Sequence, residues 1–390
     1  MNKHILNPDF QYFIIKNLNT DISSLLLKKQ LFDEISQQEL VEQIEAKKKC
    51  QKKLPTWFST PNIFYPNKLN IEQTSSEITA EFKANLIEGK SLIDLTGGLG
   101  VDDYYFSKKV NQITHCEINE KLSKITQHNF KQLGVNNITF ISGDGLEYLK
   151  NTNQKFDWIY IDPSRRHNHK GKVFLLEDCL PNVPENLDFL FSKTDQLLIK
   201  NSPILDITNT IKSINHIQQI HIVAVKNEVK ELLIILKKGY EGHIEIISSN
   251  LGTNQPNFCF SFQNQQKPVF STIKKYLYEP NSAIMKSGGF NEICCQFNVS
   301  KLHQHSHLYT SDNLQMFPGR SFEVIDIFPY QKKNLKKRFG KQQFNITTRN
   351  FPKSVVEIRK ESSIKEGGKQ YIFFTTDIAD NKIVILCNKI

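Results

Sequence analysis

The sequence contains no hydrophobic stretch long enough to span a membrane. None of its apolar runs reaches the length of about 20 residues that a transmembrane helix needs. The first residues, Met1–Phe10, also lack the charged, apolar and small-residue regions of a secretory signal peptide. We therefore expect a cytoplasmic protein without a membrane partner.

Cysteine is scarce, and its placement does not suggest disulfide pairing. The seven cysteines are odd in number and scattered, and several stand in apolar surroundings. This pattern is typical of a reduced intracellular protein that uses cysteine as a small hydrophobic residue. His303, His305 and His307 alternate along the chain without cysteine or carboxylate partners at ligand spacing, so we predict no metal site.

Length and charge set the broad frame. A chain of 390 residues is expected to form two or three domains. The formal net charge of +10 permits a polyanionic partner such as RNA, although lysine-rich composition alone does not require one. No internal repeats or low-complexity tracts occur, and we make no prediction of oligomeric state.

The N-terminal part is predicted to be helical. Apolar residues recur near a period of 3.6 within residues 1–53, with charged residues between them. Pro55, Pro61 and Pro66 then interrupt the pattern among several aromatic residues. We expect a helical region followed by an ordered linker over residues 1–66.

Residues 67–250 alternate between short apolar strands and helical segments, which predicts a parallel sheet with helices on both faces. Too few residues separate Gln219–Val225 from Glu231–Lys237 for a crossover helix, so the sheet should end antiparallel. We predict an α/β, Rossmann-like, seven-stranded sheet that is parallel with an antiparallel last strand. The other predicted strands are Ser91–Leu95, Gln112–Cys116, Ile138–Ser142, Phe156–Ile161 and Gln196–Ile199.

The C-terminal third is more polar and is predicted to form two small α+β units, residues 275–318 and 319–390. A basic helix is expected at Pro329–Phe339. Its charges form either a solvated face or a surface that follows the phosphates of RNA. The basic residues concerned are Lys332, Lys333, Lys336, Lys337 and Arg338.

A glycine-rich turn follows the first predicted strand of the sheet. Glycines between a strand and a helix let the backbone approach a ligand, and the helix N-terminus supplies unpaired N–H groups. Asp94, at the strand end, is a candidate partner for an ammonium group of that ligand. Dinucleotide-binding sites have the same glycine-rich turn between a strand and a helix, so the turn alone does not identify the ligand. The candidate ligand-binding residues of the turn are Asp94, Thr96, Gly97, Gly98 and Gly100.

Acidic residues also follow the second and third strands. Glu117, followed by Ile118, lies where a carboxylate can bind the two hydroxyls of an adenosine ribose. Asp144, followed by Gly145, can accept a hydrogen bond from an adenine amino group, cap the next helix, or do both.

The fourth strand ends in Asp162-Pro163-Ser164-Arg165. In a doubly wound sheet this edge faces the ligand crevice, and proline stiffens the loop that carries the carboxylate. Asp162 there can accept a hydrogen bond from an exocyclic amine and orient its lone pair. We select these four residues as the candidate catalytic segment.

Taken together, these motifs resemble the class I S-adenosylmethionine-dependent methyltransferases. More closely, the chain resembles the bacterial family with a small ferredoxin-like unit and a C-terminal THUMP-like domain. The resemblance implies a methyltransferase domain at residues 67–250, S-adenosylmethionine as the cofactor and RNA as the substrate. The segments that carry it are Glu72–Glu77, Asp94–Asp102, Asp162–Arg166, Leu277–Pro280, His307–Asp312, Phe317–Arg320, Thr375–Asp377 and Val384–Cys387.

The acceptor stays open at this point. Enzymes that methylate base amines usually carry a second proline and an aromatic residue after Asp-Pro, whereas this chain has Ser164 and Arg165. Arg165 could stack on a base or bind a phosphate. Ribose 2′-O methylation, for which Asp162, Lys200 and Glu228 are candidates, is one alternative. A protein or small-molecule substrate is another, and a non-catalytic RNA-binding module with a relic cofactor pocket is a third.

Overall fold

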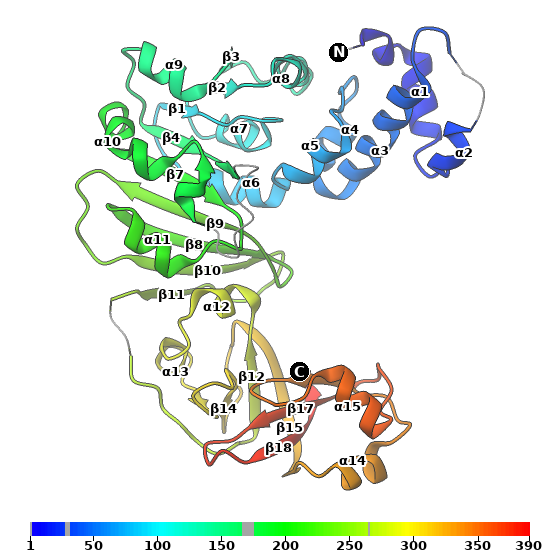
Figure 1. The fold of residues 1–390 in the computed structure, drawn as a ribbon, viewed down its shortest axis with the longest axis vertical. Coiled ribbons are helices and arrows are strands. Elements are labelled where there is room, and N and C mark those ends of the chain that lie inside the picture. Colours follow the sequence, from blue (N-terminus) through cyan, green and yellow to red (C-terminus); the bar gives the residue numbers. More distant parts are fainter. Residues whose placement is uncertain (1, 28–31, 166–174, 264–265) are drawn as a thin grey trace. The chain divides into compact units, whose positions relative to one another are not determined.

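The computed structural model describes residues 2–27, 32–165, 175–263 and 266–390 (Figure 1). The described part of the chain forms two compact units. The first unit comprises Met1–Gln218 and Leu232–Glu241, and the second comprises Gln219–Glu231 and Gly242–Ile390. No helix of the described ranges is both long enough and apolar enough to cross a membrane.

The N-terminal part of the first unit is helical, as predicted. The longest helix, α3, begins with a capping box in which Ser36 and Glu39 satisfy each other's backbone N–H groups. The predicted linker is partly helical, because Pro55 fits the first turn of a short helix. Residues 28–31 lie outside the described ranges. The helices are η1 Lys3–Leu6, α1 Pro8–Lys16, α2 Ile22–Leu26, α3 Gln37–Lys53, α4 Pro55–Ser59 and α5 Lys68–Gln73.

A mostly parallel sheet forms the centre of the first unit. Among the described residues the strand order of the whole sheet is β11-β10-β8-β9-β7-β4-β1-β2-β3. In the stretch β9-β7-β4-β1-β2-β3 all neighbours are parallel except β7 and β9. The predicted parallel sheet followed by an antiparallel strand is therefore confirmed, but the described sheet has nine strands where seven were predicted, because β10 and β11 extend it beyond β8. The strands are β1 Ser91–Asp94, β2 Gln112–Glu117, β3 Ile138–Ser142, β4 Trp158–Ile161, β7 Gln196–Asn201 and β9 Glu228–Lys237, whose first four residues belong to the second unit.

Helices connect the parallel strands of this sheet (Figure 1). Because the parallel strands run in one direction, their carboxyl ends meet at one edge, where Asp94 ends β1, Glu117 ends β2 and Asp162 follows β4. The helices are α6 Glu77–Ala84, α7 Val101–Phe106, α8 Glu120–Gln132, α9 Gly145–Asn151, α10 Val183–Lys193 and α11 Ile207–Ser213. A short antiparallel pair, β5 Ser164–Arg165 and β6 Cys179–Leu180, follows β4, and η2 Leu176–Asp178 precedes β6.

The second unit begins with three strands and continues into a seven-stranded sheet. β10 (Glu245–Leu251) is parallel to β8 (Ile217–Val225) and antiparallel to β11 (Phe258–Ser261). The larger sheet has the order β13-β14-β12-β15-β18-β17-β16 and is antiparallel apart from β16 and β17. Its strands are β12 Tyr276–Pro280, β13 Ser300–Lys301, β14 Tyr309–Ser311, β15 Gly319–Pro329, β16 Asn345–Thr348, β17 Gln370–Thr376 and β18 Lys382–Lys389.

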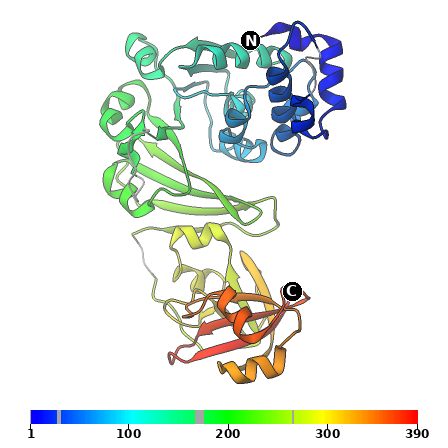
Figure 2. The same cartoon turned by 45° about the vertical axis from the view of Figure 1, so that its right-hand side comes forward.

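The helices in the described part of the second unit are α12 Ser282–Ser287, α13 Glu292–Gln296, α14 Lys332–Phe339 and α15 Val355–Ser362. α14 and α15 lie side by side on the larger sheet (Figure 2). Leu335 and Phe339 of α14 and Ile358 of α15 pack in one apolar cluster with Phe374 and Val384 of the sheet. This packing buries one face of α14 and leaves its lysines on the other face.

Candidate active site

A cavity of about 130 Å³ opens at the carboxyl edge of the parallel strands in the first unit. It brings together five of the residues predicted from the sequence: Asp94, Thr96, Gly97, Gly98 and Asp162. The segment around α5, the start of α7, and one residue each of α8 and β4 complete its wall. These further lining residues are Asn70, Gln73, Thr74, Ser75, Leu99, Val101, Asp102, Leu122 and Tyr160.

The glycine turn needs its glycines for steric reasons. Gly98 and Gly100 have φ values of 57° and 73°, in the left-handed region that disfavours side chains. At Gly97 a Cβ atom would lie 2.1 Å from Cε1 of His115. The backbone of the turn therefore rests directly on the His115 ring and stays open toward the cavity.

Thr96 links the turn to the Asp162 segment. Asp94 Oδ1 accepts hydrogen bonds from the backbone N–H of Thr96 at 2.7 Å and from its hydroxyl at 3.1 Å. The same hydroxyl oxygen accepts the backbone N–H of Asp162 at 2.7 Å. The ends of β1 and β4 are thus joined through one side chain.

Asp94 also belongs to a buried polar cluster with Asp103 and His115. His115 Nδ1 lies 2.6 Å from Asp103 Oδ2. Burial and the charge of Asp103 raise the pKa of Asp94 well above its usual range, and burial and Asp102 do the same for the pKa of Asp103. Burial lowers the pKa of His115. Within the described ranges these three residues alone have metal-ligand geometry, but the 2.6 Å separation is that of a shared proton.

Glu117 is held in one orientation at the end of β2. Its Oε2 accepts the backbone N–H of Gly98 at 2.9 Å, and its Oε1 accepts that of Asn119 at 2.7 Å. Glu117 does not line the 130 Å³ cavity but adjoins it through Gly98. The side chain of Ile118 beside it is 73% exposed, which is unusual for isoleucine.

Asp144 and Gly145 lie at the start of α9. Asp144 caps this helix, because its Oδ1 accepts the backbone N–H of Glu147 at 3.0 Å. A Cβ atom at Gly145 would lie 2.6 Å from the carbonyl oxygen of Leu95. Gly145 therefore permits close packing of α9 against the end of β1, and Asp144 remains exposed at that edge.

The Asp162 segment carries an ion pair that the sequence alone could not place. Asp162 Oδ2 contacts Lys200 Nζ on β7. The Lys200 side chain is only 12% exposed, while that of Asp162 is 37% exposed. Pro163 is buried and Ser164 exposed. The backbone of Arg165 lies in β5, but its side chain and all of Arg166 lie outside what the structure describes, as do the stacking and phosphate contacts expected of them.

Asp102, Ser75 and Tyr160 also line the cavity and were missed by the sequence interpretation. Asp102 Oδ2 accepts hydrogen bonds from the hydroxyls of Ser75 at 2.9 Å and Tyr160 at 2.8 Å. Its Oδ1 lies 3.2 Å from Nζ of Lys83, a lysine with no exposed surface. No local sequence pattern marks this group, because its members come from separate elements of the fold.

Glu228 is not part of this cavity. It belongs to the second unit, is largely exposed and forms an ion pair of 2.6 Å with Lys230. Of the candidates for ribose 2′-O methylation, the first unit therefore contributes the Asp162–Lys200 pair.

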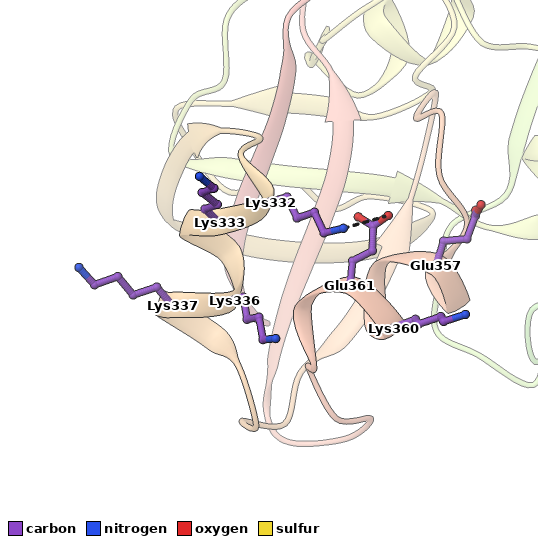
Figure 3. A pocket seen from close by; sticks show the side chains of 7 residues that line it. All are labelled: Lys332, Lys333, Lys336, Lys337, Glu357, Lys360 and Glu361. Atoms are coloured by element: carbon purple, nitrogen blue, oxygen red, sulfur yellow. Dashed lines mark ion pairs between the residues drawn. The ribbon is translucent and has the colours of Figure 1, made fainter.

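The second unit carries a lysine-lined groove between α14 and α15, with a volume of about 1030 Å³ (Figure 3). The four predicted lysines of α14 line it together with Lys360, Glu357 and Glu361. Lys332 forms a long ion pair of 3.9 Å with Glu361. Arg338 is not among the lining residues, and its guanidinium group pairs with Asp326 at 2.6 Å.

The parallel strands, the antiparallel β9 and the glycine turn beside Asp162 define a methyltransferase of the S-adenosylmethionine-dependent class. Residues 69–169 match the ubiE/COQ5 methyltransferase family. Residues 276–318 match a ferredoxin-like domain, and residues 319–389 match a THUMP-like domain.

A crystal structure named "putative methyltransferase", from Porphyromonas gingivalis W83, is similar along the whole chain. It is 30% identical, with a TM-score of 0.88, and the match covers 99% of this chain and 98% of that one. The chain belongs to the same family: S-adenosylmethionine-dependent methyltransferases that carry a C-terminal THUMP-like domain.

Shorter similarities connect the chain with named RNA methyltransferases. An uncharacterised RNA methyltransferase of Fusobacterium nucleatum is 31% identical over 27% of this chain and 24% of its own length. One from Mycoplasma mobile is 29% identical over 46% of this chain and 49% of its own length. The chain thus spans about half, or less, of these curated relatives.

Proposed function

We propose that this protein transfers a methyl group from S-adenosylmethionine to RNA at the cavity that contains Asp162. The observation that carries the proposal is that one cavity is lined by both the glycine turn and Asp162. The names of the partly matching relatives and the THUMP-like match support RNA as the substrate class. We propose the cytoplasm as the place of action.

The residues at the turn fit the proposed cofactor. Gly97 and Gly98 present backbone without side chains, and Glu117 holds a carboxylate beside them that suits vicinal ribose hydroxyls. Ile118 supplies an exposed apolar surface that suits an adenine ring, and Asp144 an acceptor for its amino group. When bound, S-adenosylmethionine supplies an activated methyl group on a sulfonium. The protein's own part is then to position the acceptor.

We propose a base amine as the acceptor, oriented by Asp162. Lys200 contacts Oδ2 of this carboxylate, and we propose that Oδ1 accepts a hydrogen bond from the amine. Pro163 stiffens the segment. The hydrogen bond from the backbone N–H of Asp162 to the hydroxyl oxygen of Thr96 fixes the backbone of the segment relative to the turn. Ser164 and Arg165 complete the proposed catalytic segment.

The Asp162–Lys200 pair favours a second candidate, methylation of a ribose 2′-hydroxyl. A lysine that passes its own proton to the paired carboxylate can then remove the proton from a hydroxyl group. Lys200 lies in this arrangement, in a mostly buried position. A protein or small-molecule acceptor and a non-catalytic RNA-binding role are the remaining alternatives.

The groove between α14 and α15 is the proposed contact for the RNA backbone. Lysine ammonium groups bind the phosphates of RNA with little dependence on its nucleotide sequence. The residues proposed for this contact are Lys332, Lys333, Lys336 and Lys337, with Arg338 at the edge of the same helix.

The test is transfer of labelled methyl from S-adenosylmethionine to total RNA, protein extract or small metabolites by the full-length chain. We expect label in RNA, and loss of transfer in Asp162→Ala with cofactor binding largely kept. Label only in protein or metabolites would exclude RNA as the substrate. Absence of cofactor binding at sub-millimolar concentration would exclude the enzyme.

A further inference from the structure

Two segments of the second unit that carry the family resemblance, Leu277–Pro280 and Phe317–Arg320, line neither the donor cavity nor the lysine groove. In the structure they lie side by side on neighbouring strands. Glu279 of β12 is directly opposite Arg320 of β15 in the antiparallel register. The charged residues of the two segments therefore meet at one point of the larger sheet.

A buried carboxylate holds two arginine side chains at this point, since only 5% of the Glu279 side chain is exposed. Its Oε2 accepts a hydrogen bond from Nε of Arg320 at 2.7 Å and also contacts Nη2 of that residue. Its Oε1 accepts a hydrogen bond at 3.0 Å from Nε of Arg349, which follows β16, and Nη2 of Arg349 lies 2.9 Å away. The Arg320 guanidinium group also lies over the rings of Phe322 and Tyr371, 5.5 and 5.6 Å from their centroids. Both guanidinium groups are thus fixed in place.

The cluster carries one positive charge more than the carboxylate requires. A single guanidinium group neutralises a buried carboxylate, so the second arginine leaves an excess of one charge. Among the residues that the structure describes, no other acidic group lies within ion-pair distance of Arg320 or Arg349. A fixed guanidinium group without an acid of its own is suited to bind an anion.

Both arginines keep hydrogen-bond donors open to solvent. The exposed fractions of the Arg320 and Arg349 side chains are 34% and 32%. Over the described ranges Nη1 of neither residue has a hydrogen-bond partner, and neither atom is among the buried polar atoms that lack one. Arg320 also lines a hollow of about 400 Å³ together with the exposed Lys389. A ligand can therefore reach guanidinium groups that the protein has already oriented.

The neighbourhood of Arg349 is cationic. Burial and, after it, the charges of Lys301, Arg349 and His305 lower the pKa of His307 to about 4. His307 belongs to a third segment that carries the family resemblance, His307–Asp312. Several positive groups thus lie near one another at this place, and their combined field attracts anions.

The anion that fits the cluster is a phosphodiester. The planar fork of an arginine matches the oxygens of a phosphate, and more than one fork can bind the same phosphate group. A phosphodiester carries a single negative charge, which equals the excess charge of the cluster. RNA presents such a group at every nucleotide.

We propose that Arg320 and Arg349 bind a phosphate of the RNA substrate, and that Glu279 is the positioning residue that holds their guanidinium groups. This inference rests on the proposed function, because it takes RNA as the substrate class. The site is separate from the lysine groove, since none of these three residues lines that groove. Two fixed guanidinium groups define the place of one phosphate, whereas lysines on flexible stems attract phosphates without fixing them.

The test measures binding of a fluorescent oligouridylate to the full-length chain at several salt concentrations. Arg349→Met removes the excess charge and leaves Glu279 neutralised by Arg320. This variant should bind the RNA roughly five- to tenfold more weakly. The slope of the logarithm of the binding constant against the logarithm of the salt concentration should become shallower by about one. Glu279→Gln keeps both arginines and removes the acid, so its affinity should stay the same or rise.

Arg359→Met is the matched control for the loss of charge. Arg359 is partly buried in the same unit, donates to backbone carbonyl oxygens and lines neither the groove nor the hollow. Its replacement should leave RNA affinity and the salt slope unchanged. If Arg349→Met and Arg359→Met change the affinity equally, or Glu279→Gln weakens it as much as Arg349→Met, the cluster only supports the fold and the proposal is wrong.

Chemical modification tests the same site without a substitution, in case a variant does not fold. Phenylglyoxal reacts with accessible guanidinium groups, and mass spectrometry of peptides locates the adducts. Arg320 and Arg349 should be modified in the free wild-type chain and protected by saturating oligouridylate. Equal modification with and without the RNA, or no modification in the free chain, contradicts the proposal.

Failure of the proposed function and failure of the arginine site give different results. A wild-type chain that does not bind oligouridylate even at low salt contradicts RNA as the substrate class. A wild-type chain that binds it, together with an Arg349→Met variant of equal affinity and equal salt slope, contradicts only the arginine site.

Discussion

Gly97 lies against the ring of His115, and this contact leads to a steric prediction. A Cβ atom 2.1 Å from Cε1 cannot be accommodated without moving the buried ring or the turn. We expect Gly97→Ala to lower the free energy of unfolding by about 1–3 kcal/mol, measured in urea. We also expect it to weaken S-adenosylhomocysteine binding more than tenfold.

Gly134→Ala is the matched control for this change. Gly134 has a φ of 73°, but a Cβ atom there would meet nothing within 4 Å. Its replacement should cost about 1 kcal/mol of backbone strain and leave donor binding unchanged. Equal donor affinity in both alanine variants would show that the turn tolerates a side chain at Gly97.

The buried Asp94 carboxyl gives a pH-dependent prediction. A carboxyl group whose pKa is raised in the folded state stabilises the fold below its unfolded pKa of about 4 and loses this contribution as the pH rises through its folded pKa. In Asp94→Asn the amide oxygen still accepts from Thr96, and the amide group has no charge to bury. The variant should therefore gain stability relative to wild type between pH 4 and pH 8, by about 1 kcal/mol or more.

Thermal unfolding of both proteins across this pH range measures the difference. If the stability difference between Asp94→Asn and wild type stays constant or shrinks toward pH 8, Asp94 is ionised in the folded protein over this range.

At the scale of the element, α14 combines a buried apolar face with an exposed row of lysines. Replacement of Lys333 and Lys336 by glutamate should weaken RNA binding and leave stability unchanged, because Leu335 and Phe339 still pack on the sheet. A plot of the logarithm of the binding constant against the logarithm of the salt concentration has a slope that reflects the number of phosphates bound. This slope should become shallower by roughly one for each phosphate that the variant no longer binds. Filter binding at several salt concentrations measures both quantities.

The matched control is Lys212→Glu, an exposed lysine in the last turn of α11 in the first unit. It makes the same change of charge at a lysine that does not line the groove. If Lys212→Glu reduced RNA affinity as strongly as one substitution on α14, the net charge of the protein would determine the affinity, and the groove lysines would have no special role.

Elements with strong local patterns were predictable from the sequence. The strands β1, β2, β3, β4 and β7 are short apolar runs between helices, and the structure has all of them near the predicted positions. The basic helix was also predicted, although α14 starts at Lys332 and not at Pro329. The helix α4 was not predicted, because Pro55 was taken as a helix breaker when it begins a helix.

The cavity was predictable only in part. Asp94, Gly97, Gly98 and Asp162 lie at strand ends or in the turns after them, so strand order alone brings them to one edge. The meeting of Lys83, Ser75 and Tyr160 around Asp102 depends on how α6 packs beside α7 and β4, which no local pattern encodes. The Asp162–Lys200 pair likewise depends on β7 lying next to β4.

At the scale of the whole molecule, a cofactor-binding unit is joined to a second unit with a lysine groove, in a chain of net charge +10. This combination is expected of an enzyme that acts on a polyanion, since the second unit can hold phosphates while the first performs the transfer. The full-length chain should therefore bind RNA with an affinity that falls steeply as salt increases.

The central claim is methyl transfer to RNA at Asp162, and mass spectrometry of nucleosides tests it most directly. RNA incubated with the full-length chain and donor carrying a deuterated methyl group is digested to nucleosides and analysed. We predict one labelled nucleoside, methylated on a base amine, that is absent with Asp162→Ala. A label on the ribose would favour the Lys200-assisted alternative, and unlabelled RNA beside a donor-bound enzyme would contradict the proposed function.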